Sequence, residues 1–205
     1  MNHKERMLSG LPYKGWMDGL SEERRINSCR IYEYNSLHPD DTKRRDALLR
    51  EMLGGVGTDV YFTQPFHSDY GSNIFIGNNF FANFNCVILD VAKVTIGDHV
   101  MFGPNVSLYT AGHPLHPVSR RSGYEYGIEI TIGDNVWLGG NVVVNPGVKI
   151  GSNVVIGSGS VVTKDIPDGV FAAGNPCRVI REITEEDRTY YYRDRKFDVE
   201  EISSV

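Results

Sequence analysis

A branched aliphatic residue recurs at every sixth position over residues 132–162, and this rhythm is the strongest pattern along the chain. The series consists of Ile132, Leu138, Val144, Ile150, Ile156 and Val162. A second column of small or β-branched residues follows four positions later, at Val136, Val142, Val148, Val154 and Ser160. A hexapeptide period is typical of a parallel β-helix, in which each repeat forms one flat side of a coil. The pattern therefore predicts a mainly β protein built as a solenoid.

The same period is present earlier in the chain, in a less regular form. Two short series step by six residues: Ile76, Ala82 and Ile88, then Ile96, Phe102 and Leu108. The register shifts by two residues between them, which indicates a short insertion around residues 91–93. A much longer interruption covers residues 110–129, where prolines and glycines predict a protruding loop and not a strand.

The repeat also has a glycine and asparagine pattern. Glycine follows four of the six regular aliphatic positions, at Gly133, Gly139, Gly151 and Gly157. We expect these glycines to make room for the chain to turn, and Asn and Asp at the corners to adopt left-handed backbone angles. Stability then comes from the stacking of neighbouring coils. All these residues build a scaffold, so we expect function to reside in whatever interrupts it.

The first part of the chain has helical periodicity instead. Residues 18–37 are charged, with apolar side chains at helical spacing and a plausible start at Ser21. Residues 40–53 predict a second helix, capped by Asp40 or Asp41 and ended by Gly54 and Gly55. Two short amphipathic helices need a surface to pack on, which the β-helix provides. We therefore divide the chain into a helical segment (1–57), a β-helix (58–181) and a charged tail (182–205) that forms a short helix or an arm over the last coil.

Composition narrows the function classes. The chain has 205 residues, enough for one domain with an extension, and a net charge of −5, which argues against bulk attraction to nucleic acid or to an anionic membrane. No apolar run resembles a signal peptide or reaches the length of a membrane span. The three cysteines, Cys29, Cys86 and Cys177, are widely separated and odd in number, so we expect a reducing, cytoplasmic setting.

Several stretches together resemble a known family. They are Ala111-Gly112-His113-Pro114 in the long interruption, the segment ITIGDNVWLGGNVVVNPGVKIG, and the ending VVTKDIPDGVFAAGNPCRVIREI. In combination they resemble the hexapeptide-repeat sugar O-acetyltransferases, in particular the galactoside (thiogalactoside) and maltose acetyltransferases. The resemblance covers essentially the whole chain. It includes the KERMLSG segment and the helical pair, which are similar to the N-terminal part of maltose acetyltransferases.

The resemblance implies features that periodicity alone does not provide. These are a left-handed parallel β-helix, a homotrimer with active sites between neighbouring subunits, and acetyl-coenzyme A as the acetyl donor. A small sugar is the implied acceptor, and no metal is expected. The hand rests on the resemblance alone, because parallel crossovers elsewhere are overwhelmingly right-handed.

Acetyl transfer to a sugar hydroxyl needs a general base, and histidine is the natural one near pH 7. His113 stands at the position that matches the family's catalytic base. Glu125, twelve residues further along the same loop, resembles the carboxylate of maltose-acetyltransferase-like members. It could orient the imidazole or bind a sugar hydroxyl. For His116 we favour a structural role.

On the acceptor side, the resemblance points to Asp69, Asn83 and Asp90, whose carboxylates and amide suit the binding of hydroxyl groups. The chain also departs from the family pattern. Asp69 replaces a serine of the galactoside enzyme, and Asp90 lies beside a ligand position occupied here by Val91. The family's N-terminal substrate aspartate falls at Gly15, with Asp18 nearby. The sequence therefore leaves the exact acceptor open.

On the donor side, the matching positions follow the regular coils. The backbone amide of Gly140 is expected to face the thioester oxygen, with Trp137 packed nearby. Ser158, Thr163 and Lys164 match the path of the pantetheine and phosphates, and Arg178 and Arg181 match the nucleotide end. A negatively charged protein needs such local cations to hold a polyanionic cofactor.

Three other readings stay open on the sequence. One is a hexapeptide acetyltransferase for a non-sugar acceptor. Another is a zinc carbonic anhydrase on the same scaffold, which needs three histidines on one metal, whereas only His113 and His116 lie close together in the sequence. The third is a purely structural β-helix, which would not need an excursion as long as residues 110–129.

Overall fold

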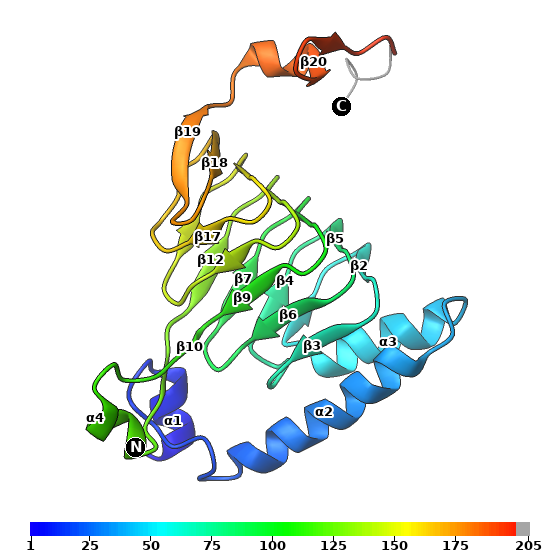
Figure 1. Ribbon diagram of the computed structural model, residues 1–205. Helices are drawn as coiled ribbons and strands as arrows, with labels where there is room; N and C mark the ends of the chain where they lie inside the picture. The colour runs from blue at the N-terminus through cyan, green and yellow to red at the C-terminus, as the bar shows by residue number, and fades with distance from the viewer. Residues whose placement is uncertain (200–205) are drawn as a thin grey trace.

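The computed structural model describes residues 1–199 and shows a three-sided solenoid of stacked coils with helices at its N-terminal end (Figure 1). Each side is one sheet, and the pairing between successive coils is parallel throughout the three sides. The first side contains β1 (Gly55–Val56), β4 (Ile74–Ile76), β7 (Val94–Ile96), β12 (Ile130–Ile132) and β15 (Lys149–Ile150). The second contains β2 (Val60–Phe62), β5 (Phe80–Ala82), β8 (Met101–Phe102), β13 (Trp137–Leu138), β16 (Val155–Ile156) and β18 (Val170–Ala173). The third contains β3 (Phe66–Ser68), β6 (Cys86–Leu89), β9 (Ser107–Tyr109), β14 (Val143–Val144) and β17 (Val161–Val162).

The strand register confirms the hexapeptide reading. Ile132 pairs with Ile150, eighteen residues later, so a regular coil consists of three six-residue sides. In the earlier coils Ile76 pairs with Ile96, twenty residues later. The two extra residues are the insertion that the broken register predicted.

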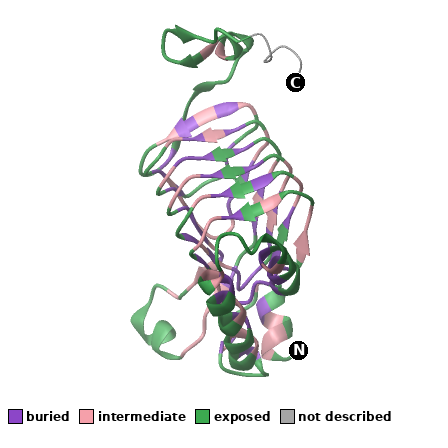
Figure 2. Ribbon diagram, turned by 90° about the vertical axis from the view of Figure 1, so that its right-hand side faces the viewer, coloured by how far each residue is buried: buried purple, intermediate pink, exposed green. Residues whose placement is uncertain are grey.

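The aliphatic columns of the repeat are buried and fill the solenoid interior. Figure 2 shows buried positions recurring along the stacked coils. Near its N-terminal end the aliphatics give way to phenylalanines. The ring of Phe80 lies 5.0 Å from that of Phe62 and 5.1 Å from that of Phe102, measured between centroids, and each of the three side chains is at most 1% exposed. Because these three large aromatic rings are buried against one another, we expect them to contribute strongly to stability.

The glycines of the repeat are required for a reason other than the one predicted. The left-handed angles fall on corner residues such as Asn135, Asn141 and Asn153, as expected, whereas the glycines after the aliphatics do not have positive φ. Instead, each lies against the next coil. A Cβ on Gly97 would lie 2.2 Å from Oδ1 of Asp134, and one on Gly133 would lie 2.5 Å from Oγ of Ser152.

This close approach lets side chains of one coil accept hydrogen bonds from backbone amides of the preceding coil. Oδ1 of Asp98 accepts from the amide of Asn78 (2.6 Å), and Oδ1 of Asp134 accepts from the amide of Asp98 (2.8 Å). Ser152 and Asp168 continue the series toward the C-terminal end. The result is a ladder of side-chain to backbone bonds along one corner of the solenoid.

The ladder gives stability a pH dependence. Hydrogen bonds from Asn78 hold the pKa of Asp98 below its usual value. A carboxyl whose folded pKa is depressed contributes stability that is present above its unfolded pKa, about 3.9, and is lost as pH falls through the folded value. We therefore expect the melting temperature of the wild type to exceed that of Asp98→Asn at pH 6, and the difference to disappear by about pH 2. Asp46→Asn, at an exposed site on α3, is the control. A difference that is independent of pH would contradict the role of the charge.

Both predicted helices are present, and they cover the N-terminal end of the solenoid (Figure 1). They are α2 (Leu20–Ser36) and α3 (Thr42–Met52), the latter capped by Asp41, which accepts from the amide of Arg44. Tyr34 on α2 donates a hydrogen bond from its hydroxyl to the carbonyl of Phe62 (2.7 Å). The helices therefore close the apolar interior under the first coil. A further short helix, α1 (His3–Leu8), was not predicted.

The interruption at residues 110–129 projects from the coils, but the prediction that it contains no strand was wrong. β10 (Ala111–Gly112) pairs antiparallel with β11 (Tyr126–Gly127), and α4 (Pro117–Arg121) lies between them. His116 is the N-cap of α4, and its Nδ1 accepts from the amide of Val118 (3.3 Å). The excursion is thus a small hairpin with its own helical tip.

At the other end, β19 (Arg178–Glu182) folds back antiparallel on β18. The tail continues as a 3₁₀ helix, η1 (Glu185–Arg188), and a hairpin of β20 (Tyr190–Tyr192) and β21 (Arg195–Lys196). The prediction placed the tail over the last coil. Instead, these elements stand beyond β19 (Figure 1). The remainder of the predicted tail, residues 200–205, lies outside the described residues. Within residues 1–199, no helix has the length and hydrophobicity to cross a bilayer.

Candidate functional site

The hairpin brings His113 and Glu125 together. His113 directly follows β10 and Glu125 directly precedes β11, so antiparallel pairing of these two strands places the side chains beside each other. Nε2 of His113 lies 3.9 Å from Oε2 of Glu125, and the His113 side chain is 58% exposed, whereas that of Glu125 is 24% exposed. An accessible imidazole backed by a half-buried carboxylate is the arrangement of a general base with an orienting partner.

The Glu125 carboxylate occupies space that Gly15 leaves free. A Cβ on Gly15 would lie 2.4 Å from Oε1 of Glu125. An aspartate at position 15, as the family pattern has it, would therefore collide with the glutamate. The departure at position 15 is therefore coupled to Glu125: glycine there makes room for a carboxylate that arrives from the hairpin. Asp18, the other nearby acid, instead accepts a hydrogen bond from the amide of His3.

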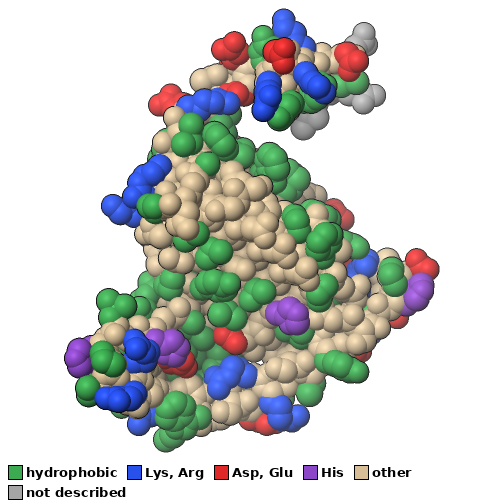
Figure 3. Space-filling view, in the orientation of Figure 1, with side chains coloured by type: hydrophobic (Ala, Val, Ile, Leu, Met, Phe, Trp, Pro, Cys, Tyr) green, Lys and Arg blue, Asp and Glu red, His purple; other side chains and the backbone are tan. Residues whose placement is uncertain are grey.

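Asp69 belongs to the same cluster. It follows β3 at the same corner of the solenoid as the hairpin, and burial raises the pKa of its carboxyl. The positive charge of Arg24 opposes that shift and the negative charge of Glu125 adds to it, so all three groups lie within electrostatic reach. In Figure 3, histidine, acidic and basic side chains gather where α1 and α4 lie in Figure 1.

Arg24 was not singled out in the sequence. It reaches from α2 and donates to the carbonyl of Gly15 (2.7 Å) and to the hydroxyl of Tyr70 (2.5 Å). Tyr13 and Tyr70 are also part of this region and were also missed. No local spacing connects these residues with the hairpin, so only the packing of the N-terminal segment on it could identify them.

Asp90 lies near this cluster but is fully buried. Its Oδ1 accepts from the amides of Asp69 (3.0 Å) and Tyr70 (2.9 Å), and its Oδ2 accepts from that of Asn73 (3.3 Å). Burial raises the pKa of Asp90 to about 7, while the backbone donors act in the opposite direction. The Asp90 carboxylate holds the turn that carries Asp69 and does not face solvent. Its position therefore differs from the predicted direct contact with an acceptor.

Asn83 lies at a different corner. It follows β5, and its Oδ1 accepts from the amide of Phe84 (2.8 Å). Gly140 and Ser158 follow β13 and β16 on the coils above, so they line the same corner. Trp137, on β13, is 50% exposed beside them. Two further predicted donor residues, Thr163 and Lys164, are exposed after β17, at the same corner as the hairpin.

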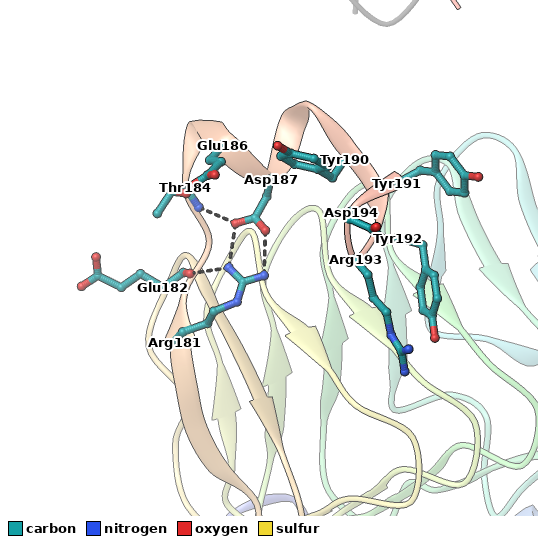
Figure 4. Close-up of a pocket in the computed structure, with 10 residues that line it drawn as sticks. All are labelled: Arg181, Glu182, Thr184, Glu186, Asp187, Tyr190, Tyr191, Tyr192, Arg193 and Asp194. Atoms are coloured by element: carbon teal, nitrogen blue, oxygen red, sulfur yellow. Dashed lines mark hydrogen bonds and ion pairs between the residues drawn. The ribbon is translucent and has the colours of Figure 1, made fainter. Parts of the chain in front are cut away.

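Arg178 and Arg181 project from β19, and Arg181 is already paired. Its guanidinium makes two bonds of 2.7 Å to the carboxylate of Asp187 (Figure 4), which hold the pKa of Asp187 at about 2. Arg181 and Asp187 border a cavity of about 940 Å³ lined by the tail, including Tyr190 and Arg193, whereas Arg178 is not among its lining residues. This cavity is separate from His113.

A metal centre finds no support in the described part of the chain. Among residues 1–199, no three His, Cys, Asp or Glu side chains converge in a way that could hold a metal ion. His116, the neighbour that the carbonic anhydrase alternative needs, caps α4 instead.

Comparisons with known proteins agree with this architecture. Residues 6–57 match the maltose acetyltransferase hexapeptide capping motif, and residues 129–164 match the bacterial transferase hexapeptide with six repeats. The galactoside O-acetyltransferase of Escherichia coli (strain K12) is 50% identical over 192 residues, which cover 94% of this chain and 95% of that protein.

Two solved structures are similar along nearly the whole chain. A galactoside acetyltransferase in complex with coenzyme A has a TM-score of 0.94 and 49% identity, covering 97% of this chain and 100% of that one. A maltose O-acetyltransferase from Clostridium difficile 630 has a TM-score of 0.89 and 50% identity, covering 90% and 99%. With the hexapeptide coils, the capping helices and the histidine hairpin all in place, the chain belongs to the galactoside and maltose O-acetyltransferases, a family of hexapeptide-repeat acyltransferases.

Proposed function

We propose that the protein transfers the acetyl group of acetyl-coenzyme A to a hydroxyl of a galactoside, maltose or related sugar, with His113 as the general base. The observation that carries this proposal is the exposed His113 imidazole backed by Glu125, whose charge in turn acts on Asp69. The coenzyme A in the similar structure supports the choice of donor, and the printed names of the relatives support the acceptor class.

The reaction then follows from the residues. His113 takes the proton of the acceptor hydroxyl as its oxygen attacks the thioester carbonyl. The new C–O bond forms, the C–S bond breaks, and the proton is delivered to the departing thiolate of coenzyme A. The backbone amide of Gly140 is assigned to the oxyanion that develops in between. Glu125 orients the imidazole and stabilises its charged form.

For the acceptor we assign Asp69 and Asn83 to the binding of hydroxyl groups, and Asp90 to the turn beneath Asp69. Asp69 is supported by its position in the cluster with Arg24 and Glu125. Asp90 is supported in its indirect role by the three backbone amides that bond to it. For the donor we assign Trp137, Ser158, Thr163 and Lys164 to the pantetheine and phosphate path, and Arg178 and Arg181 to the nucleotide, with Asp187 as a competitor for Arg181.

We further propose that the β-helix is left-handed and that the protein forms a homotrimer with active sites between subunits. Within one chain, His113 and Asn83 lie at opposite ends of the third sheet, where β6 has four residues and β9 has three, a span of about 10–13 Å at roughly 3.3 Å per residue. Reacting atoms must approach to about 3–3.5 Å. A complete site therefore requires the hairpin corner of one copy to face the Asn83 corner of the next.

An apolar stripe supports association of copies. Tyr61, Phe81, Met101 and Trp137 are register neighbours across the second sheet. Their exposed fractions lie between 38% and 51%, which is high for four adjacent large side chains and typical of a protein–protein contact. We also place the protein in the cytoplasm, supported by three cysteines that form no disulfide.

An acceptor screen tests the proposed function. The purified protein is incubated with acetyl-coenzyme A and a panel of galactosides, maltose, glucose and non-sugar alcohols and amines, and release of free thiol is followed. We expect thiol release that depends on a sugar and on the protein. Preference for a non-sugar acceptor would replace the assigned acceptor class, and no acetyl transfer to any acceptor, with coenzyme A still bound, would overturn the proposed reaction.

A further inference from the structure

The N-terminal segment, and not the hairpin alone, holds Glu125 in place. The amide of Tyr13 donates to the carbonyl of Glu125 (2.9 Å), and the amide of Glu125 donates to the carbonyl of Tyr13 (3.0 Å). Two residues further on, Gly15 lies against the Glu125 carboxylate. A stretch near the start of the chain therefore forms one wall of a niche for a side chain of the hairpin.

Tyr13 is the unexplained member of this niche. Its side chain is 0% exposed and packs with Met7, Leu20, Tyr70 and Val91. Its hydroxyl is buried and has no hydrogen-bond partner of ordinary geometry. A buried hydroxyl without a partner is unfavourable, and such groups in a folded protein usually have a role.

The hydroxyl faces the Glu125 carboxylate. Burial raises the pKa of Tyr13, and the negative charge of Glu125 is the next cause of the shift. A side-chain hydrogen bond to Glu125 is a further cause, so the carboxylate lies within reach of the hydroxyl, although the contact falls outside ordinary hydrogen-bond geometry. A small movement of Glu125 would close the bond, in line with catalytic hydrogen bonds that are long in unliganded enzymes and shorten when substrate binds.

Arg24, the neighbouring cation, donates its hydrogen bonds to groups other than the Glu125 carboxylate. One of its terminal nitrogens donates to the hydroxyl of Tyr70 and the other to the carbonyl of Gly15. It therefore fixes the backbone of the niche. Tyr13 remains as the buried side-chain donor that faces the Glu125 carboxylate.

We propose that Tyr13 is a positioning residue for acetyl transfer: its hydroxyl donates a hydrogen bond to Glu125 and so holds the carboxylate in the place from which it orients His113. This inference rests on the proposed function. It assigns to the N-terminal segment a part in the reaction beyond covering the solenoid. Gly15 complements Tyr13, because the absence of a side chain there lets the carboxylate reach the hydroxyl.

The test is a double-mutant cycle. Tyr13→Phe keeps the ring and both backbone bonds and removes only the hydroxyl. We expect kcat to fall about tenfold, equivalent to about 1.4 kcal/mol, with an unchanged KM for acetyl-coenzyme A. In a Glu125→Ala background, which has no side-chain acceptor for the hydroxyl, Tyr13→Phe should cause no further loss, because the two residues act through one interaction. Gly15→Ala places a Cβ against the Glu125 carboxylate and displaces it. It should therefore give the same loss of kcat while leaving Tyr13 unchanged.

Tyr34→Phe is the matched control. This tyrosine is also fully buried, and its hydroxyl bonds to the carbonyl of Phe62 near the C-terminal end of α2, whereas the other end, at Leu20, packs in the cluster of Tyr13. We expect it to lower the melting temperature and leave kcat unchanged. A wild-type kcat in Tyr13→Phe, or the same tenfold loss in the Glu125→Ala background, would overturn the inference. His113→Ala, measured in parallel, separates this outcome from failure of the proposed function: an active His113→Ala would overturn the base itself.

Discussion

Replacement of His113 by alanine is expected to lower kcat for sugar acetylation by roughly 100- to 10,000-fold, the usual contribution of a general base. The acceptor hydroxyl must lose its proton as it attacks, and alanine leaves no group at position 113 to take it. The side chain is 58% exposed, so its loss leaves no cavity in the core. We therefore expect the variant to fold, to assemble as the wild type does, and to bind acetyl-coenzyme A with unchanged affinity.

Thiol release with the preferred sugar measures the turnover, and isothermal titration with acetyl-coenzyme A measures binding. His116→Asn is the matched control, since it lies on the same hairpin, and asparagine can also cap α4 in place of the imidazole. It should retain activity within about twofold. If His113→Ala itself retains turnover within about tenfold, roughly 1.4 kcal/mol, then His113 is not the base.

The second large effect concerns stability. Phe80→Ala should lower the free energy of unfolding by about 3–5 kcal/mol, the range for a large aromatic truncated in a core. Phe80 is 1% exposed and lies between Phe62 and Phe102, so its removal opens a cavity that the stiff coils around it cannot close. Because domains of this kind are stable by only about 5–15 kcal/mol, such a loss is a large fraction of the total.

Urea unfolding followed by circular dichroism measures this change. Tyr32→Ala is the control, since Tyr32 lies on α2 with 77% of its surface exposed, and it should change the free energy of unfolding by less than about 0.5 kcal/mol. A loss below about 1 kcal/mol for Phe80→Ala would mean that the phenylalanine cluster is not closely packed in solution.

The coils were predictable because their signal is local and repeated. Each aliphatic from Ile132 to Val162 meets the same environment, so the six-residue period determines both the strand positions and the buried face. The two helices followed from similar local rules, with Asp41 as the cap and Gly54 just past the end. The reason for the glycines was not local: the collision at Gly97 is with Asp134, on the next coil, and a single repeat contains no trace of it.

The candidate site shows the same division. His113 and Glu125 were recognisable from their motif, but their distance depends on the pairing of β10 with β11, which the prolines and glycines of the loop concealed. Asp90 has a suitable side chain in the expected stretch, yet its carboxylate turns inward to three backbone amides. Arg181 has the expected charge, yet it pairs with Asp187 in a tail whose path the sequence did not indicate.

By itself, the sequence determined the solenoid, its capping helices, the place of the long excursion and the histidine on it, because each depends on a period or a motif within a few residues. Only the tertiary structure decided how far apart those groups stand and what surrounds them. Tyr13, Gly15 and Arg24 reach Glu125 across about a hundred residues of chain, and no spacing rule connects them. The packing of the N-terminal segment against the hairpin makes them neighbours, and that packing depends on surfaces that exist only once the coils have formed.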